Sequence, residues 1–320
     1  MKHIVFYSGG LGSWATAKRV VNRYGKDNVI LMFTDTLIED KDLYRFLIES
    51  VAEIFGQEVK DLIIKTNGIP PVSHETMEAR REYLIRLAEE TNKKFPQLAW
   101  IADGRDPWQV FKDKRWIGNS RRAQCSHILK QDMSAKFLKV HFPNPEDVVL
   151  YLGIDWTEEH RKAAPTRNWS PYKVEFPMCE EPLVYKLELE SELAAIGIKL
   201  PELYKLGFSH NNCGGFCVRA GQGHFANLLK QKPELFKYHE EKEEEMRQFL
   251  EKDYSILTKQ KNKIKYQLTL KQLREELQGG SCDIDMTDIG GCGCMVDDED
   301  ENYLESLAKR TEKDDLEDRK

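Results

Sequence analysis

A glycine-rich loop between an apolar run and a helical pattern dominates the start of this 320-residue chain. Lys2–Tyr7 is a run of β-branched and aromatic residues, and Ser-Gly-Gly-Leu-Gly-Ser follows at residues 8–13. Trp14–Tyr24 has the apolar spacing of a helix, and a second apolar run, Val29–Phe33, leads into Thr-Asp-Thr. Strand, loop, helix and strand in this order predict a βαβ unit, whose crossover is nearly always right-handed and parallel.

The loop has the composition of a phosphate-binding site. Glycines allow a tight turn that brings consecutive backbone N–H groups together, and the hydroxyls of Ser8 and Ser13 add donors. The N-terminus of the following helix favours negative charge. The loop matches neither the Walker pattern nor the Gly-x-Gly-x-x-Gly pattern of dinucleotide folds. The local alternative is a plain tight turn, for which glycine is also a usual residue.

Alternating strands and helices continue along the chain. We predict further strands at Val59–Ile64 and Glu146–Leu152 and helices at Asp40–Glu53 and His74–Asn92. The other predicted helices are Gln131–Val140, Leu183–Ile196, Gly221–Leu229, Pro233–Asp253 and Leu268–Leu277. This order indicates an α/β fold with a Rossmann-like parallel sheet at residues 1–164 and a helical, cysteine-bearing region at residues 165–295.

The net charge of −6 comes from the end of the chain rather than from its body. From Asp297 to Lys320 there are eleven acidic and five basic residues, and the remaining 43 basic and 43 acidic residues cancel. We expect the acidic tail, residues 296–320, to be solvated and disordered. A neutral body neither favours nor excludes nucleic acid as a partner, and only a local basic patch would do so.

Composition and cysteine usage favour a folded cytoplasmic protein without membrane contact. Hydrophobic residues make up 40% of the chain. No apolar stretch approaches the ~20 residues of a membrane span, and the first residues form no secretory signal. Seven cysteines is an odd number, unlike the disulfide framework of a secreted protein. Cytosolic thiols more often serve metal binding or catalysis.

Four stretches, in order, resemble the motifs of the PP-loop superfamily, the adenine nucleotide α-hydrolases. The loop at residues 8–13 resembles Ser-Gly-Gly-x-x-Ser, and Phe33–Glu39 resembles Phe-x-Asp-Thr-Gly-x-Glu. Cys125–Lys130 resembles Cys-Thr-x-x-Leu-Lys, and residues 153–161 resemble Gly-Ile-Arg-x-x-Glu-Ser-x-x-Arg. The last three motifs are typical of the branch that contains phosphoadenosine phosphosulfate reductases and DNA-phosphorothioation enzymes. More loosely, the resemblance extends to the Cys213–Cys217 region.

The resemblance implies a set of residues that bind ATP and Mg²⁺. The loop would clasp the phosphates, and residues at the carboxyl ends of the strands would complete the site. These residues are Ser8, Gly9, Gly10, Gly12, Ser13, Phe33, Asp35, Thr36, Gly153 and Ile154. The local alternative for Asp35 and Thr36 is a helix N-cap.

The resemblance also implies three catalytic residues. Lys130 and Arg161 would neutralise charge as pyrophosphate leaves, whereas most lysines and arginines are simply solvated. Cys125 would act as acceptor or nucleophile, because nearby cations stabilise a thiolate. The alternative for Cys125 is a small buried apolar residue.

Two departures from the family pattern bear on function. Most ATP-hydrolysing members carry an aspartate that helps to hold magnesium at the position of Gly12. The chain would therefore use another acid such as Asp35 for the metal, bind the metal more weakly, or bind a nucleotide without cleaving it. The Glu-Cys-Gly-x-His motif of sulfonucleotide reductases is missing from the sequence. Reduction of sulfonucleotides is therefore the third choice among the possible functions.

Two cysteine pairs, Cys213 with Cys217 and Cys292 with Cys294, have the close spacing of metal ligands. Four thiolates suit either Zn²⁺ or a [4Fe–4S] cluster. Cys282 could replace either member of the second pair, and the alternative is a set of unrelated thiols in two loops.

The favoured function is an ATP-dependent enzyme that adenylylates an acceptor and releases pyrophosphate. It would transfer sulfur to a nucleic acid or nucleotide, with a partner protein as sulfur donor. The alternative is a non-catalytic protein that senses or sequesters an adenine nucleotide.

Overall fold

The computed structural model describes residues 1–120, 122–280 and 283–290. Its main sheet is parallel throughout, with the strand order β3-β2-β1-β4-β5. The strands are β1 (Lys2–Phe6), β2 (Val29–Asp35), β3 (Leu98–Ala102), β4 (Val148–Tyr151) and β5 (Lys173–Glu175). A mixed α/β protein built on a parallel sheet is confirmed, and this order is that of Rossmann-like sheets.

Strand β1 lies at the centre of the sheet and is buried on both faces. Alternate residues of the strand point to opposite faces, so Val5 and Ile4 belong to different apolar clusters. The Val5 cluster contains residues of α1 (Leu11–Tyr24), α2 (Lys41–Phe55), α4 (Met77–Lys94) and α9 (Lys186–Ala195). The Ile4 cluster contains residues of α7 (Met133–His141) and of the chain around Trp169. Helices therefore cover both faces of the sheet.

The predicted strand at Val59–Ile64 is wrong, because these residues enter a helix, α3 (Lys60–Thr66). Val59, Leu62 and Thr66 are buried, whereas Ile64 is 69% exposed, which is helical rather than alternating burial. The third strand on this side of the sheet is β3, which the sequence reading missed. A short apolar run does not separate helix from strand by period alone.

Several predicted helices are confirmed with small shifts of their ends. Helix α2 begins after Asp40, whose carboxylate accepts a hydrogen bond from the backbone N–H of Asp42 at 2.8 Å. Helix α12 (Pro233–Leu250) follows α11 (Gln222–Gln231), and α13 (Leu270–Gln278) begins after the N-cap Thr269. The remaining α-helices of four or more residues in the described chain are α5 (Pro107–Lys114), α8 (Ala163–Asn168) and α10 (Glu202–Lys205).

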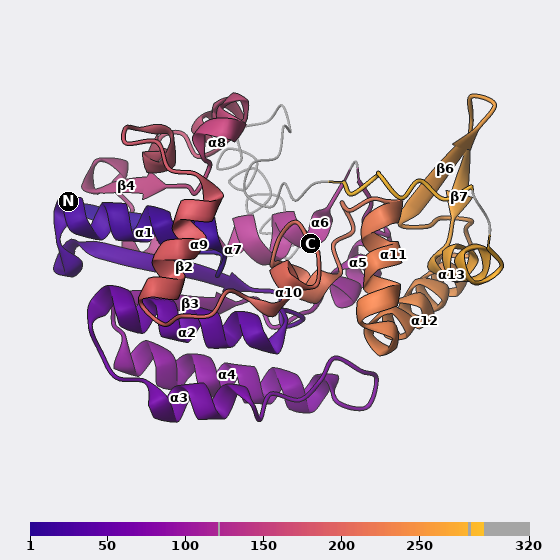
Figure 1. Ribbon diagram of the computed structural model, residues 1–320, viewed down its shortest axis with the longest axis horizontal. Helices are drawn as coiled ribbons and strands as arrows, with labels where there is room; N and C mark the ends of the chain where they lie inside the picture. Colours follow the sequence, from indigo (N-terminus) through magenta and orange to yellow (C-terminus); the bar gives the residue numbers. More distant parts are fainter. Residues whose placement is uncertain (121, 281–282, 291–320) are drawn as a thin grey trace, which may run out of the picture.

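An antiparallel hairpin between α12 and α13 had no counterpart in the sequence prediction. Its strands are β6 (Leu257–Lys261) and β7 (Ile264–Leu268), joined by a turn at Asn262 and Lys263. Both turn residues have positive φ, 51° and 66°, as the two-residue turns that match strand twist require. Figure 1 shows the hairpin standing out from the helices around it.

The chain beyond residue 164 packs against the sheet domain. Met178, Leu189 and Leu193 lie in the same apolar cluster as Val5. The expected acidic tail lies outside the described residues. Among the helices that the structure describes, none combines the length and the apolarity that crossing a bilayer takes.

Candidate functional site

A large cleft lies at the carboxyl ends of β1 and β4. The chain leaves β1 towards β2 on one side, and β4 pairs with β1 on the other side, so strand order reverses at this point. Open parallel sheets bind ligands at such switch points. The cleft has a volume of about 1030 Å³ and is lined by residues 8, 10–13, 120, 153, 155, 157, 158, 160, 161, 178, 184, 186, 189, 204, 209–212, 219 and 290. Its volume is sufficient for a nucleoside triphosphate.

The loop after β1 has the turn that a phosphate cradle needs. Gly9 has a φ of +73°, in the left-handed region that favours glycine, and α1 begins at Leu11. The Ser13 hydroxyl donates to the Gly10 carbonyl at 2.9 Å and accepts from the Gly10 N–H at 3.3 Å. Ser8 donates to the Ser13 hydroxyl at 3.3 Å. The two predicted serines therefore hold the loop and face the cleft.

The loop after β4 touches the loop after β1 through two glycines. A Cβ on Gly153 would lie 3.1 Å from the backbone carbon of Gly12 and 3.1 Å from the Ser13 nitrogen. A Cβ on Gly12 would lie 3.3 Å from the Gly153 carbonyl oxygen. These contacts are tighter than ordinary van der Waals separation. Glycine at both positions therefore lets the two loops close the floor of the cleft.

Cations and carboxylates both line the cleft. Arg161, Lys186 and Arg219 line it, together with Asp155 and Glu158. Arg161 donates to the Glu158 carboxylate at 2.6 Å. The structure thus places the predicted Arg161 in the same cleft as the phosphate loop. Two carboxylates together with substrate phosphates are the usual ligand set of Mg²⁺, so Asp155 and Glu158 fit this metal by their chemistry.

Asp35 lies beneath the cleft rather than on its wall. Its carboxylate accepts from the Leu37 N–H at 2.7 Å, the Tyr44 hydroxyl at 2.8 Å and the Trp100 indole N–H at 3.0 Å. Burial, followed by the charge of Glu39, raises the pKa of Asp35 to about 6 despite these donors. A carboxylate held in this way fits a structural role better than the magnesium role considered from the sequence.

Of the other residues predicted to bind the nucleotide, some line the cleft and others lie in the core or elsewhere. Gly153 lines the cleft, whereas Ile154 belongs to the apolar cluster on one face of the sheet. Phe33 packs edge-on against Trp100 at a ring distance of 5.6 Å. Thr36 lines a second, small pocket next to Lys130.

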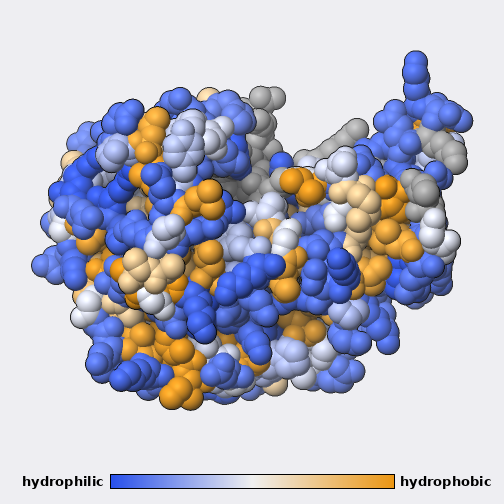
Figure 2. Space-filling model, in the orientation of Figure 1, coloured by the Kyte–Doolittle hydropathy of each residue, from blue (hydrophilic) through white to orange (hydrophobic). Residues whose placement is uncertain are grey.

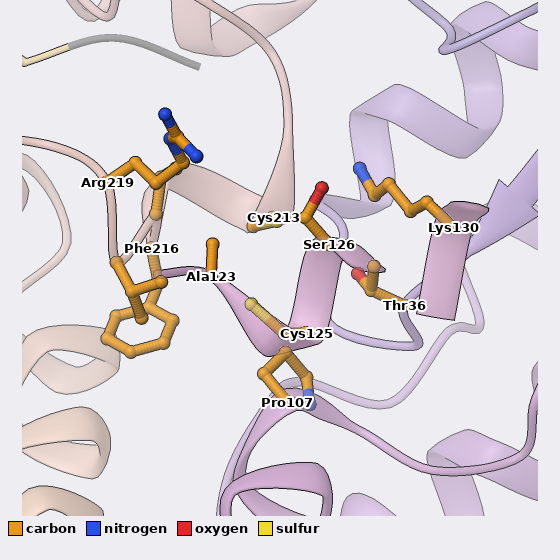
Figure 3. Close-up of a pocket in the computed structure, with 11 residues that line it drawn as sticks. Thr36, Pro107, Ala123, Cys125, Ser126, Lys130, Cys213, Phe216 and Arg219 are labelled. Carbon is orange, nitrogen blue, oxygen red and sulfur yellow. The ribbon is translucent and has the colours of Figure 1, made fainter. Parts of the chain in front are cut away.

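That small pocket brings together cysteines that are far apart in the sequence. Cys125, Cys213 and Cys217 line a cavity of about 10 Å³, beside Phe216 and Lys130 (Figure 3). Cys125 comes from α6 (Gln124–Ser126), whereas Cys213 and Cys217 come from the loop before α11. The sequence reading had assigned Cys125 to catalysis and the other two to a metal. That the three cysteines line one pocket was not predicted from the sequence.

The metal prediction itself extends beyond what the structure describes. Cys292 and Cys294 lie outside the described residues. Within the described ranges, no group of three or more histidine, cysteine or acidic side chains is arranged to hold a metal ion. The zinc or iron–sulfur site therefore stays a prediction.

Lys130 lies beside the cysteine pocket and is 6% exposed. Its Nζ is 3.5 Å from the Glu39 carboxylate, which also accepts from the Thr36 hydroxyl at 3.0 Å and from the Cys213 N–H. Glu39 thus ties the end of β2 to the cysteine-bearing loop. The Lys130 side chain sits on a π-helical segment, His127–Asp132, of the kind often found at functional sites.

His210 and Asn211 are site residues that the sequence reading passed over. Both line the cleft, and the Asn211 amide donates to the Gly9 carbonyl at 3.1 Å. The His210 Nε2 and the Asn211 Oδ1 are buried without a hydrogen-bond partner among the described residues. Burial and the charges of His224 and Lys130 lower the pKa of His210 to about 3, so its imidazole is neutral. The only sequence signal was their place just before Cys213.

Comparison with protein-family models and with curated proteins finds no match to this chain.

Proposed function

We propose that this protein binds ATP in the cleft at the ends of β1 and β4 and transfers its adenylyl group to an acceptor, with release of pyrophosphate. One observation carries the proposal. The Ser-Gly-Gly-Leu-Gly-Ser loop sits at the switch point of a parallel sheet, in a cleft that Arg161, Lys186 and Arg219 also line. Anion-binding backbone and cations converge there.

The chain's own residues support specific tasks in this reaction. The loop N–H groups and the hydroxyls of Ser8 and Ser13 would hold the phosphates. An acceptor oxygen attacks the α-phosphorus, the bond to the bridging oxygen breaks, and pyrophosphate leaves with the electron pair. Arg161 and Arg219 would neutralise the charge that develops on that leaving group. Asp155 and Glu158 would hold Mg²⁺, which supplies charge neutralisation on the phosphates.

The second half of the proposal concerns sulfur. A sulfur or nitrogen nucleophile then attacks the adenylylated carbon, and AMP leaves with the bonding electrons. The meeting of Cys125 with Cys213 and Cys217 favours sulfur, because three thiols line one pocket beside Lys130. A nucleic acid is the proposed acceptor, and a partner protein is the proposed sulfur donor.

A non-catalytic adenine-nucleotide-binding protein is the second candidate. The close approach of Gly12 to the Gly153 carbonyl favours it, since an aspartate at position 12 would crowd that oxygen.

Product analysis separates the two candidates. The full chain is incubated with ATP, Mg²⁺ and mixed nucleic acid, and the nucleotide products are resolved by chromatography. The enzyme proposal predicts pyrophosphate together with an equal amount of adenylyl groups, recovered on the nucleic acid or, where a nucleophile displaces them, as AMP. Unchanged ATP that is nevertheless bound with measurable affinity would support the binder, and ADP with phosphate would contradict the proposed bond cleavage.

A further inference from the structure

Two segments of the chain concentrate positive charge although the body is neutral. Residues 112–122 contain five basic residues and one acidic residue, and residues 252–265 contain five lysines and one aspartate. Each acid is already paired: Asp113 accepts from Arg105 at 2.8 Å, and Asp253 accepts from Arg247 at 2.7 Å. One of the lysines, Lys259, is paired with Glu276. By sequence, the two segments together hold ten basic and two acidic residues.

The two segments meet at a groove beside the hairpin. The rings of Trp116 and Tyr254 lie 5.7 Å apart at a tilt of 42°. They line a cavity of about 330 Å³ together with Asn119, Lys265 and Gln267. Aromatic rings next to amide and ammonium groups are the combination on which unpaired bases stack and phosphates bind.

The hairpin presents a polar, cationic face to this groove. The register pairs Gln260 with Lys265 and Thr258 with Gln267, so these side chains share one face. Lys263 lies at the tip of the turn and is exposed, as is Lys265. The hairpin at residues 257–268 forms a hydrophilic arm that projects from the body (Figure 2).

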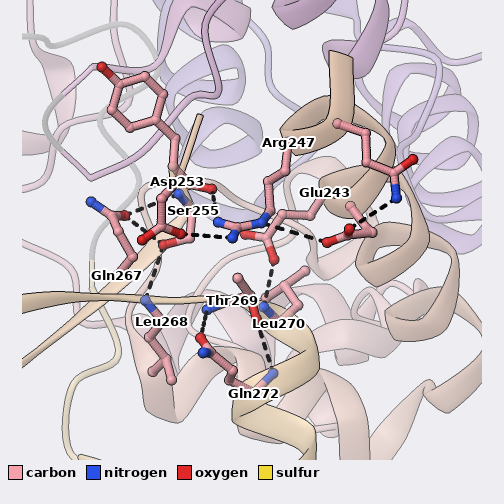
Figure 4. Close-up of polar contacts among 12 residues, drawn as sticks. Glu243, Arg247, Asp253, Ser255, Gln267, Leu268, Thr269, Leu270 and Gln272 are labelled. Carbon is pink, nitrogen blue, oxygen red and sulfur yellow. Dashed lines mark hydrogen bonds and ion pairs between the residues drawn. The ribbon is translucent and has the colours of Figure 1, made fainter. Parts of the chain in front are cut away.

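The base of the arm is fixed by buried hydrogen bonds (Figure 4). The Glu243 carboxylate accepts from the Ile256 N–H at 2.9 Å and from the Leu270 N–H at 2.6 Å, on either side of the hairpin. The Ser255 hydroxyl donates to Gln267 at 2.7 Å and accepts from the Leu268 N–H at 3.1 Å. An arm held in place beforehand loses less entropy when a ligand binds.

We infer that this groove and the arm beside it bind single-stranded nucleic acid, with bases against Tyr254 and Trp116 and phosphates along Lys263 and Lys265. Ser120 lines both this groove and the large cleft, so a nucleic-acid strand bound in the groove would reach the edge of the nucleotide site. That this strand is the acceptor rests on the proposed function. The binding itself does not.

Fluorescence anisotropy with a labelled oligothymidylate and the full chain tests this inference. Wild-type protein should bind it with an affinity that falls linearly with salt on logarithmic axes. The double variant Lys263→Glu/Lys265→Glu should bind at least about tenfold more weakly, with a shallower salt slope. The matched control, Lys60→Glu/Lys139→Glu, reverses two exposed lysines on α3 and α7 and should bind as wild type does.

A second pair of variants tests the aromatic contact. Tyr254→Ala should weaken binding about tenfold, because a stacked base is lost, whereas Tyr254→Phe keeps the ring and the affinity. Equal losses in the arm variant and the control, no binding at low salt, or tighter binding of a duplex than of the single strand would each overturn the inference. ATP affinity, measured by calorimetry on the same variants, should not change. If the wild-type protein does not bind ATP, this result counts against the proposed function and not against the binding of nucleic acid.

Discussion

The phosphate loop and the hairpin arm are held in place by different means. The loop at residues 8–13 is fixed within one βαβ unit by the hydrogen bonds of its own serines. The arm is fixed by the buried carboxylate of Glu243, which accepts from backbone N–H groups 13 and 27 residues away, and by the Ser255 hydroxyl. The hydrogen bonds of the loop join residues that are close together in the sequence. Those of the arm depend on residues that meet only in the folded chain.

Removing the carboxylate that ties the chain after β2 to Lys130 and to the cysteine-bearing loop should have the largest effect. Glu39 is 1% exposed and lies 3.5 Å from Lys130, while it also accepts from the N–H of Cys213. Glu39→Gln keeps the volume but removes the anion beside a buried cation, so the free energy of unfolding should fall by about 3 kcal/mol or more. Urea unfolding followed by circular dichroism measures this. A loss no larger than that of the exposed control Glu82→Gln would contradict the joining role.

The arm should make stability depend on pH in a defined window. Burial raises the pKa of Glu243 from 4.5 to about 7, so the folded state holds this proton more tightly than the unfolded state. Its contribution to the free energy of unfolding is therefore present below about pH 4.5. It declines by about 3 kcal/mol as the pH rises to about 7.

Glu243→Gln cannot ionise, so the stability of this variant should lack that decline. Chemical unfolding of both proteins across the window measures the difference. Parallel pH profiles would show that the carboxyl is not buried as described.

The phosphate loop should respond to backbone crowding rather than to charge. A methyl group on Gly153 would meet three backbone atoms of residues 12 and 13 at 3.1–3.2 Å, and one on Gly12 would meet a single atom at 3.3 Å. Gly153→Ala should weaken ATP binding about 100-fold, because the backbone of residues 12 and 13 would be displaced from the position that holds the phosphates. Gly12→Ala should have a smaller effect. Calorimetric titration with ATP and Mg²⁺ ranks the two, and the reverse order would refute the contact.

The smallest of these effects should come from a cleft cation. Arg161→Gln removes one of the three arginine and lysine side chains that line the cleft among the described residues, and it should weaken ATP binding about tenfold, with a smaller salt dependence. Its neighbour Lys162 is paired with Glu159 and does not line the cleft, so Lys162→Gln is the matched control. Equal affinities of the two variants would remove Arg161 from the phosphate site.

The sequence predicted the first βαβ unit because apolar strands, glycines and helical spacing are all local. It failed at Val59–Ile64, where a short apolar run fits a helix equally well, and it missed β3 (Leu98–Ala102). The hairpin was missed because its turn, Asn262 and Lys263, lacks the glycine that usually marks one. The meeting of Cys125 with Cys213 and Cys217 depends on how distant loops pack, which spacing alone does not encode.

Hydrogen exchange of the backbone amides, with and without ATP and Mg²⁺, tests the central claim most directly. The account predicts slower exchange in the peptide that covers residues 8–13 and in the peptide that covers residues 153–161, with little change in the hairpin. Protection confined to other segments, or no protection at saturating ATP, would contradict the placement of the nucleotide in this cleft.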